Sequence, residues 1–298
     1  MQITPHLLWN REVPLAACVY RDDDVDLFER QPAVLVTGSW LTVKEQMADL
    51  YARALATQGF TAVTFDFSGF GQSGGVPRQA EIPDRKISDI SAAAGQVSRL
   101  SFVKPGGVGY LAICASAQYA LAAIADGAQI SSFASVAGWF HDTETVAPFY
   151  AGREGVALRL ARGQAALDEY VRTGASPLVP AYEVGNDRAG MFFDLEYYAE
   201  PGRGAVPSWV NQMAEMSWPY WLGFDGLSAA ARVRIPALFV HSDGCVLPDN
   251  VKGVHDRLAG PAELIWAEGD QTDFYDQPKQ VSLAANAAAE HFRRTLPA

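Results

Sequence analysis

The sequence predicts an α/β protein with a mostly parallel central sheet, and three observations support this fold class. From Ala33 onward, short apolar or β-branched runs alternate with helical patterns, as in sheets whose strands are joined by crossover helices. This alternation stops for about 90 residues between Phe140 and Ala231, which is too long for a plain loop in a compact domain. Of the 298 residues, 49% are hydrophobic, enough for a sizeable core.

The pattern places each element and divides the chain into three parts. Strands are expected within residues 32–40, 61–75, 106–114, 130–139, 236–243 and 262–269. Helices are expected within residues 42–60, 86–100, 115–125 and 278–296. The first of these helices has a capping-box signature at Thr42 and Glu45, and Gly59 marks its end. The three parts are a first core segment (1–139), an inserted helical lid (140–231) and a second core segment (232–298).

Charge and composition narrow the choice of partner. A net charge of -11 disfavours nucleic acids and anionic membranes as partners, because both are polyanionic. The N-terminus has no signal-peptide pattern, and no run reaches the roughly 18 apolar residues of a membrane span. We therefore expect a cytoplasmic protein, either a monomer or a homodimer, that acts on a small molecule. Its three cysteines contain no CxxC pair, and without a glycine-rich phosphate loop or a metal-ligand cluster we expect no cofactor and no metal.

The segment "YLAICASAQYAL" contains two candidate nucleophiles, Cys114 and Ser116, at a corner between a strand and a helix. A nucleophile on such a corner needs a small residue two positions away on each side, because the strained backbone leaves no room for a large one. Cys114 has Ala112 and Ser116 at these positions, whereas Ser116 has Gln118 on one side. We therefore assign the nucleophile to Cys114. The peptide dipoles of the helix are expected to lower the pKa of its thiol.

Five blocks in chain order resemble the α/β-hydrolase superfamily: "VTGSWLTVKEQ", "DFSGFGQSGG", "GYLAICAS", "VHSDGCVLPDN" and "GDQTDFYDQP". The resemblance is to its dienelactone-hydrolase-like branch, in which the nucleophile at the corner is often cysteine. It implies the α/β-hydrolase fold over most of the chain. It also implies an oxyanion hole made by the backbone N–H groups of Trp40 and Ala115, with Ser39 beside the substrate. The turn from Asp66 to Ser73 matches a family motif to which we assign no chemistry.

In this family the acid and the histidine of the catalytic triad follow the last two strands. Asp243 is the candidate acid, although its loop is one residue shorter than the usual pattern, and Asp249 is a second candidate. At the histidine position the chain reads Gln271, and glutamine cannot take up a proton at neutral pH. The resemblance therefore implies a site with Cys114, Asp243 and Gln271 that lacks the usual base.

His141 is the candidate substitute for this base, because it ends a strand at the same sheet edge as Cys114. Otherwise Asp270, Asp273 or the substrate itself must move the proton. A missing base should slow the attack of water, since such a group typically contributes ~10²- to 10⁴-fold. Of the remaining histidines, His6, His255 and His291 are expected on the surface, and His241 is expected to brace a loop.

The predicted insert is rich in aromatic residues: residues 139–224 hold 15 of the chain's 33. About half of these rings should form the insert's own core, and the others should line a pocket, because ligand pockets are mostly apolar. We expect Trp209, Trp218 and Trp221 to contact a hydrophobic or aromatic carbonyl compound.

These observations predict a Cys114-dependent enzyme that acts on an ester, lactone, thioester or related carbonyl, by hydrolysis or by acyl transfer. Two other functions stay open. One is a cofactor-free lyase, isomerase or cyclase that stabilises an enolate in the same oxyanion hole. The other is a ligand-binding protein that has lost its activity. A covalent acyl adduct on Cys114 distinguishes the first function from the other two.

Overall fold

Eight strands form one sheet in the computed structural model, which describes residues 1–26 and 28–296. Their order across the sheet is β1-β2-β4-β3-β5-β6-β9-β10. Strand β2 runs antiparallel to both of its neighbours, and all strands from β4 to β10 in that order are parallel. In chain order the strands are β1 (Gln2–Asn10), β2 (Val13–Arg21), β3 (Ala33–Thr37), β4 (Thr61–Phe65), β5 (Val108–Ile113), β6 (Ile130–Val136), β9 (Ala237–His241) and β10 (Ala262–Trp266).

The predicted α/β architecture is confirmed, but the sheet begins earlier than expected. The hairpin of β1 and β2 precedes Ala33, and His6 lies within β1 opposite Ala17 rather than before the sheet. Because β1 is an edge strand, it buries only Leu8 completely. Strand β1 therefore lacks the apolar run that marks the interior strands, whereas β2 contains one at residues 15–20 that is not among the predicted strands.

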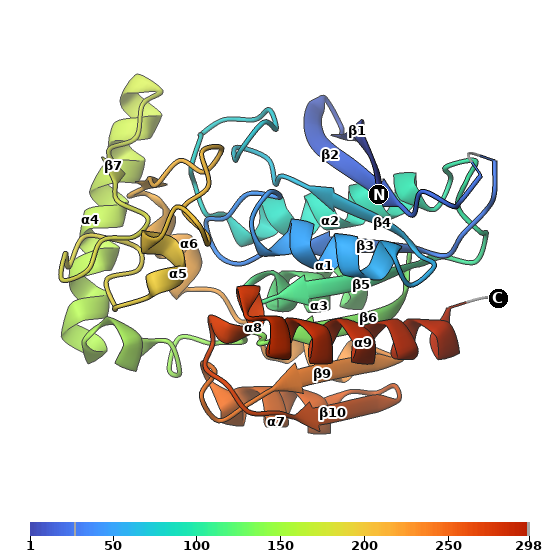
Figure 1. Cartoon of the computed structure of the whole chain (residues 1–298). Helices are drawn as coiled ribbons and strands as arrows, with labels where there is room; N and C mark the ends of the chain where they lie inside the picture. Colours follow the sequence, from blue (N-terminus) through green and yellow to red (C-terminus); the bar gives the residue numbers. More distant parts are fainter. Residues whose placement is uncertain (27, 297–298) are drawn as a thin grey trace.

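Helices cover both faces of the sheet. In Figure 1, α1 and α9 lie in front of the sheet, and α2 and α3 lie behind it. Because both faces are covered, β3, β4 and β5 are buried along their whole length, which explains their continuous apolar sequences. The helices outside the insert are α1 (Met47–Ala56), α2 (Pro83–Val97), α3 (Ser116–Ala125), α7 (Pro248–Arg257), α8 (Asp273–Asp276) and α9 (Pro278–Thr295). Among residues 1–26 and 28–296, no helix combines the length and the apolar character needed to cross a bilayer.

The chain between β6 and β9 leaves the sheet and packs at one end of it, on the left of Figure 1. It contains η1 (Ala147–Tyr150), α4 (Gly152–Thr173), β7 (Leu178–Val179), α5 (Glu196–Ala199), β8 (Met213–Ala214), α6 (Ser217–Leu222) and η2 (Ser228–Arg232). Strands β7 and β8 pair only with each other, so no strand of the main sheet lies in this insert. That residues 140–231 move as a lid stays a prediction.

The loop that follows β3 is longer than predicted. Helix α1 begins at Met47, not at Thr42, because the side chains of the loop bond within the loop. Thr42 Oγ1 donates to the Ser39 carbonyl oxygen at 2.6 Å, and the Val43 N–H donates to Gln46 Oε1 at 2.9 Å. The end of the helix is predicted more accurately than its start. Helix α1 ends at Ala56, and Gly59, with a φ of 92°, lies in the turn that follows it.

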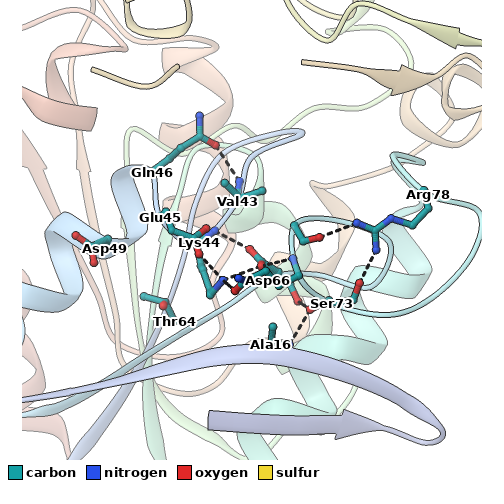
Figure 2. Close-up of polar contacts among 12 residues, drawn as sticks. Ala16, Val43, Lys44, Glu45, Gln46, Asp49, Thr64, Asp66, Ser73 and Arg78 are labelled. Carbon is teal, nitrogen blue, oxygen red and sulfur yellow. Dashed lines mark hydrogen bonds and ion pairs between the residues drawn. The ribbon is translucent and has the colours of Figure 1, made fainter. Parts of the chain in front are cut away.

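A buried ion pair fixes this loop to the turn after β4 (Figure 2). Lys44 Nζ lies 3.0 Å from Asp66 Oδ2, and the Lys44 N–H donates to Asp66 Oδ1 at 2.8 Å. The Gln72 N–H donates to Oδ2 at 2.9 Å, and Ser73 Oγ donates to the Asp66 carbonyl oxygen at 2.6 Å. Gly71, with a φ of 46°, has no room for a side chain, because a Cβ atom would lie 2.2 Å from Asp66 Oδ2. The Asp66 turn is therefore structural, and it holds in place the loop that carries Ser39 and Trp40.

Lys44→Met should lower the free energy of unfolding by about 3–5 kcal/mol, because it leaves the Asp66 carboxylate buried without its counter-ion. Adding Asp66→Asn should recover only part of this loss, since it removes the unpaired charge but its single amide oxygen can accept only one of the Lys44 and Gln72 N–H groups. Urea denaturation of both variants measures the two effects. A loss below 1 kcal/mol in the single variant would show that the pair does not hold the loop.

Candidate active site

Cys114 lies at the sharp corner between β5 and α3, as the sequence predicts. It follows Ile113, the last residue of β5, and its φ is 57°, a left-handed conformation that is strained in a residue with a side chain. The corner is held by two backbone hydrogen bonds. The Cys114 N–H donates to Val136 O at 3.1 Å, and the Trp139 N–H donates to Cys114 O at 3.0 Å.

Ser116 braces this corner from the inside. Its buried hydroxyl accepts a hydrogen bond from the Ile113 N–H at 3.2 Å and lies 3.1 Å from the carbonyl oxygens of Thr37 and Ile113. It thereby joins the ends of β3 and β5. Cys114 lines an aromatic cavity at this edge of the sheet, and Ser116 does not.

The cavity has a volume of about 400 Å³ and lies between the insert and the sheet edge at which β3, β5, β9 and β10 end. Most of its wall is aromatic, and the polar groups are few. Its aromatic residues are Trp40, Trp139, Phe149, Tyr150, Phe193, Tyr198, Trp221 and Tyr275. Its side chains that can hydrogen-bond or react, apart from the tyrosines and tryptophans, are Ser39, Cys114, Asp194, Asp270, Gln271 and Thr272.

Burial raises the pKa of the Cys114 thiol above its usual value, and four hydrogen-bond donors oppose this effect. The donors are the hydroxyls of Ser39 and Tyr275 and the backbone N–H groups of Ala115 and Trp40. The expected lowering of the pKa by the helix is therefore wrong in its net direction, because desolvation outweighs the donors. The two N–H groups that the sequence suggests for an oxyanion hole both reach the sulfur.

Gln271 lines the same cavity, but it faces Tyr275 rather than Asp243. Its Oε1 accepts from the Val246 N–H at 3.0 Å. Its Nε2 donates to the Ala137 carbonyl oxygen at 2.8 Å and to the Tyr275 hydroxyl oxygen at 3.0 Å. Gln271 therefore approaches the sulfur through Tyr275.

Asp243, the predicted acid, does not line the cavity. Its side chain is 80% exposed, and it forms an ion pair with Lys252 at 3.9 Å. The tight turn after β9 brings Gly244 beside Asp270 and points the Asp243 carboxylate into a surface groove. The alternative acid, Asp249, is 96% exposed. The expectation that either carboxylate supports the Cys114 chemistry is thus wrong for this geometry.

His141 is also unsuited to act as the base. Its Nδ1 accepts from Trp139 Nε1 at 2.6 Å, so Nε2 carries the proton, which it donates to the Trp221 carbonyl oxygen at 2.8 Å. Burial lowers the pKa of the ring to about 4, and the ring does not line the cavity. The expectation that it reaches Cys114 is wrong. His141 instead fixes two rings, Trp139 and Trp221, that form part of the cavity wall.

None of the other histidines lines the cavity in the described part of the chain. His241 braces a loop as predicted, since its Nε2 lies 3.1 Å from the Val246 carbonyl oxygen. His291 is buried beside Glu263, so the prediction of a surface position is wrong. Of the acidic alternatives, Asp273 accepts from the Asp270 N–H at 2.8 Å and so braces its loop, and Asp270 lines the cavity as an exposed residue. In the same described residues, no group of three or more potential ligands could hold a metal ion.

Of the predicted substrate contacts, Ser39 and Trp221 line the cavity, whereas Trp209 and Trp218 do not. Trp218 is fully buried and packs against Trp40 with ring centroids 6.1 Å apart. The indole N–H of Trp209 donates to the Leu41 carbonyl oxygen at 2.8 Å, which fixes its ring beside a neighbouring groove. Both rings therefore pack behind or beside the wall.

Tyr275 is the residue that sequence reasoning missed. Its hydroxyl oxygen lies 3.0 Å from Gln271 Nε2 and 3.4 Å from Ser39 Oγ, and it lines the cavity beside Cys114. Tyr275 lies within the short helix α8, four residues after Gln271, which precedes the helix in "GDQTDFYD". This spacing is the signal that could have identified it.

Cys114→Ala should abolish turnover of an activated aryl ester or thioester, whereas Ser116→Ala should keep most of it. Ser116→Ala should instead lower the free energy of unfolding by about 1–3 kcal/mol, because the buried Ile113 N–H loses its acceptor. Steady-state turnover and urea denaturation measure the two effects. Loss of turnover only in the Ser116 variant would end the assignment to Cys114.

No family model matches the sequence. Among curated proteins, the uncharacterized protein YcjY of Escherichia coli K12 is 29% identical over 303 residues, which cover 96% of each chain. The acyltransferase drtE of Aspergillus calidoustus is 26% identical over 263 residues, or 81% of this chain and 79% of drtE. A thiohydrolase of Eupenicillium brefeldianum is 32% identical over 96 residues, or 32% of this chain and 31% of its own.

Three solved structures resemble the whole chain. The hypothetical protein PA2218 of Pseudomonas aeruginosa has a TM-score of 0.82 and 24% identity and covers 97% of this chain and 94% of its own. The α/β hydrolase GrgF of Penicillium sp. sh18 (TM-score 0.79, 17% identity) and a dienelactone hydrolase of Anabaena variabilis (TM-score 0.58, 12% identity) each cover 99% of both chains. The sheet order, the corner at Cys114 and these likenesses show that the chain has the α/β-hydrolase fold.

Proposed function

We propose that this protein is an acyl-transfer enzyme that carries the acyl group of an apolar or aromatic donor on Cys114. The observation that carries the proposal is the position of the Cys114 sulfur on the wall of an aromatic cavity, within reach of the Trp40 and Ala115 N–H groups. Two such donors can hold the oxyanion that forms when a nucleophile adds to a carbonyl group. The name of the relative drtE, an acyltransferase, supports the same reaction class.

The reaction takes two steps. In the first, the Cys114 thiolate forms a bond to the carbonyl carbon of the donor, the bond to the leaving group breaks, and the acyl group stays on sulfur. The proton that Cys114 gives to solvent balances the one that the leaving group takes up. In the second step an alcohol, amine, thiol or water attacks the acyl-Cys114 and releases the thiolate.

The absence of a histidine from the cavity wall, in the described residues, favours a thioester donor. An alkoxide leaving group needs a proton from a general acid, which typically contributes about 10²- to 10⁴-fold. A thiolate is stable enough to leave without this help, because thiols have pKa values of about 8–9. The same absence makes water and alcohols poor second substrates, so the enzyme should transfer its acyl group to an amine or a thiol faster than it hydrolyses it. The named thiohydrolase among the relatives is consistent with a thioester.

A second candidate function rests on the raised pKa of Cys114. A thiol that stays protonated at neutral pH, together with the donors around it, could stabilise an enolate in a lyase, isomerase or cyclase reaction without forming an acyl-enzyme. A binding protein without activity would use the same aromatic wall. Neither function produces an adduct on Cys114.

The rate of Cys114 alkylation by iodoacetamide should rise about tenfold for each pH unit between pH 6 and pH 8. The pKa of this thiol is raised, so the reactive thiolate is a minor species over this range and its fraction grows tenfold per unit. Peptide mass spectrometry separates Cys114 from Cys18 and Cys245. A rate that stays level from pH 6 to pH 8 would mean that the thiolate is already formed.

An acyl-Cys114 should accumulate when the protein is mixed with an aryl thioester, because attack by sulfur is faster than attack by water at this site. Rapid-mixing kinetics should show a burst of about one equivalent of thiol followed by slow turnover. Gln271→His should speed the slow phase by up to about tenfold. This gain is smaller than a well-placed base provides, because Asp243 faces solvent and cannot orient the new imidazole.

Two variants serve as controls. Cys114→Ser keeps a nucleophile, but its alkoxide is a much poorer leaving group than a thiolate when the acyl group is transferred. Cys114→Ala has no nucleophile and should show no burst. Intact-protein mass spectrometry identifies the adduct. If neither the natural protein nor the Gln271→His variant shows a burst or ester turnover, the lyase and the binding-protein functions take precedence.

A further inference from the structure

Three buried side chains with a hydroxyl or amide group are joined by hydrogen bonds on the cavity wall beside the Cys114 sulfur. Gln271 Nε2 lies 3.0 Å from the Tyr275 hydroxyl oxygen, and Ser39 Oγ lies 3.4 Å from the same oxygen. All three residues line the cavity beside Cys114. Tyr275 is 2% exposed and Ser39 is 4% exposed, so solvent does not compete for these contacts.

The direction of the hydrogen bonds along this chain follows from Gln271. Its Oε1 accepts from the Val246 N–H, which fixes the amide so that Nε2 faces Ala137 and Tyr275. An amide nitrogen can only donate, so the Tyr275 oxygen is the acceptor in this contact. Ser39 Oγ, 3.4 Å away, can also donate to the Tyr275 oxygen, which leaves the proton of Tyr275 available to the sulfur of Cys114.

The hydroxyl of Tyr275 cannot replace the missing base. Burial and the neighbouring Cys114 raise the pKa of Tyr275 well above its usual value, so the hydroxyl keeps its proton at neutral pH. The hydroxyl of Tyr275 has the opposite effect on Cys114: as a hydrogen-bond donor it favours the thiolate and so lowers the pKa of the thiol.

We propose that Tyr275 is a catalytic hydrogen-bond donor, oriented by Gln271, that stabilises the Cys114 thiolate in this cavity. The proposal rests on the proposed function, in which that thiolate is the nucleophile. The proton stays on Tyr275 throughout, so the step needs neither a base nor a further reactant. Gln271 is a positioning residue in this arrangement: it occupies the place of a histidine, but it acts through a tyrosine.

The test is the pH dependence of Cys114 alkylation in the substrate-free protein. Tyr275→Phe should raise the apparent pKa of the thiol by about one unit and slow alkylation at pH 7 about tenfold, as expected for the loss of one hydrogen bond to a charged group. Tyr198→Phe is the matched control. It removes a buried hydroxyl from the same wall that lies beside Ser39 and Tyr275 and makes no hydrogen bond to the sulfur, so the apparent pKa should move by clearly less than in Tyr275→Phe.

Gln271→Leu provides a second, independent variant. It removes the group that orients Tyr275 and leaves the hydroxyl in place, so the apparent pKa of Cys114 should rise by less than in Tyr275→Phe. Thermal unfolding of each variant confirms that it is folded at the assay temperature. A titration of Tyr275→Phe that overlaps that of the natural protein overturns the proposal, and so does an equal shift in Tyr198→Phe.

This outcome is separate from that of the proposed function. The titration needs no substrate, whereas the acyl-enzyme is detected only with a thioester. A shifted titration without any adduct would retain the thiolate contact and reject acyl transfer. An adduct with an unshifted titration would retain acyl transfer and reject the role of Tyr275.

Discussion

The left-handed backbone of Cys114 is the constraint on which the rest of the site depends. A φ of 57° turns the chain from β5 into α3 within two residues, and this turn brings the sulfur to the cavity while the helix runs back along the sheet. Such a conformation costs on the order of 1–3 kcal/mol, so the surrounding structure must stabilise it. Small flanking residues, the Ser116 hydroxyl and the backbone of β6 and the following loop all contribute to this. The requirement for alanine and serine around the corner is therefore mechanical and does not depend on the reaction.

The second half of the site comes from a different part of the chain and is positioned by different forces. The Trp40 loop is fixed from behind by the Lys44–Asp66 pair and the bonds of Thr42 and Gln46. The aromatic wall is fixed by His141, whose two nitrogens bind Trp139 and the Trp221 backbone. Both supports use polar groups buried outside the cavity. The cavity itself can stay largely apolar because its supports lie one layer further out.

The sequence predicts the sheet from β3 onward, the corner and the interruption of the strand pattern, because each depends on local spacing or on periodic burial. Gln271 lies on the cavity wall, but its partners are Val246, Ala137 and Tyr275 rather than the predicted Cys114 or Asp243. The directions of single side chains are harder to predict. Asp243 turns outward because Gly244 pairs with Asp270, a contact between two loops that no local pattern encodes. Trp218 and Trp221 are three residues apart and both buried, and only the packing of Trp40 decides which of them reaches the cavity.

Buried histidines that stay neutral in the folded protein also limit its tolerance of acid. The pKa values of His141 and His241 are both lowered to about 4 by burial, whereas an unfolded chain would titrate them near 6.5. Between these values the unfolded state binds protons that the folded state excludes, so the free energy of unfolding falls as the pH drops from about 6.5 toward 4. Acid thus acts on the supports of the cavity wall before it changes the chemistry at sulfur. The lower pH limit of the folded protein is therefore set by histidines of its scaffold.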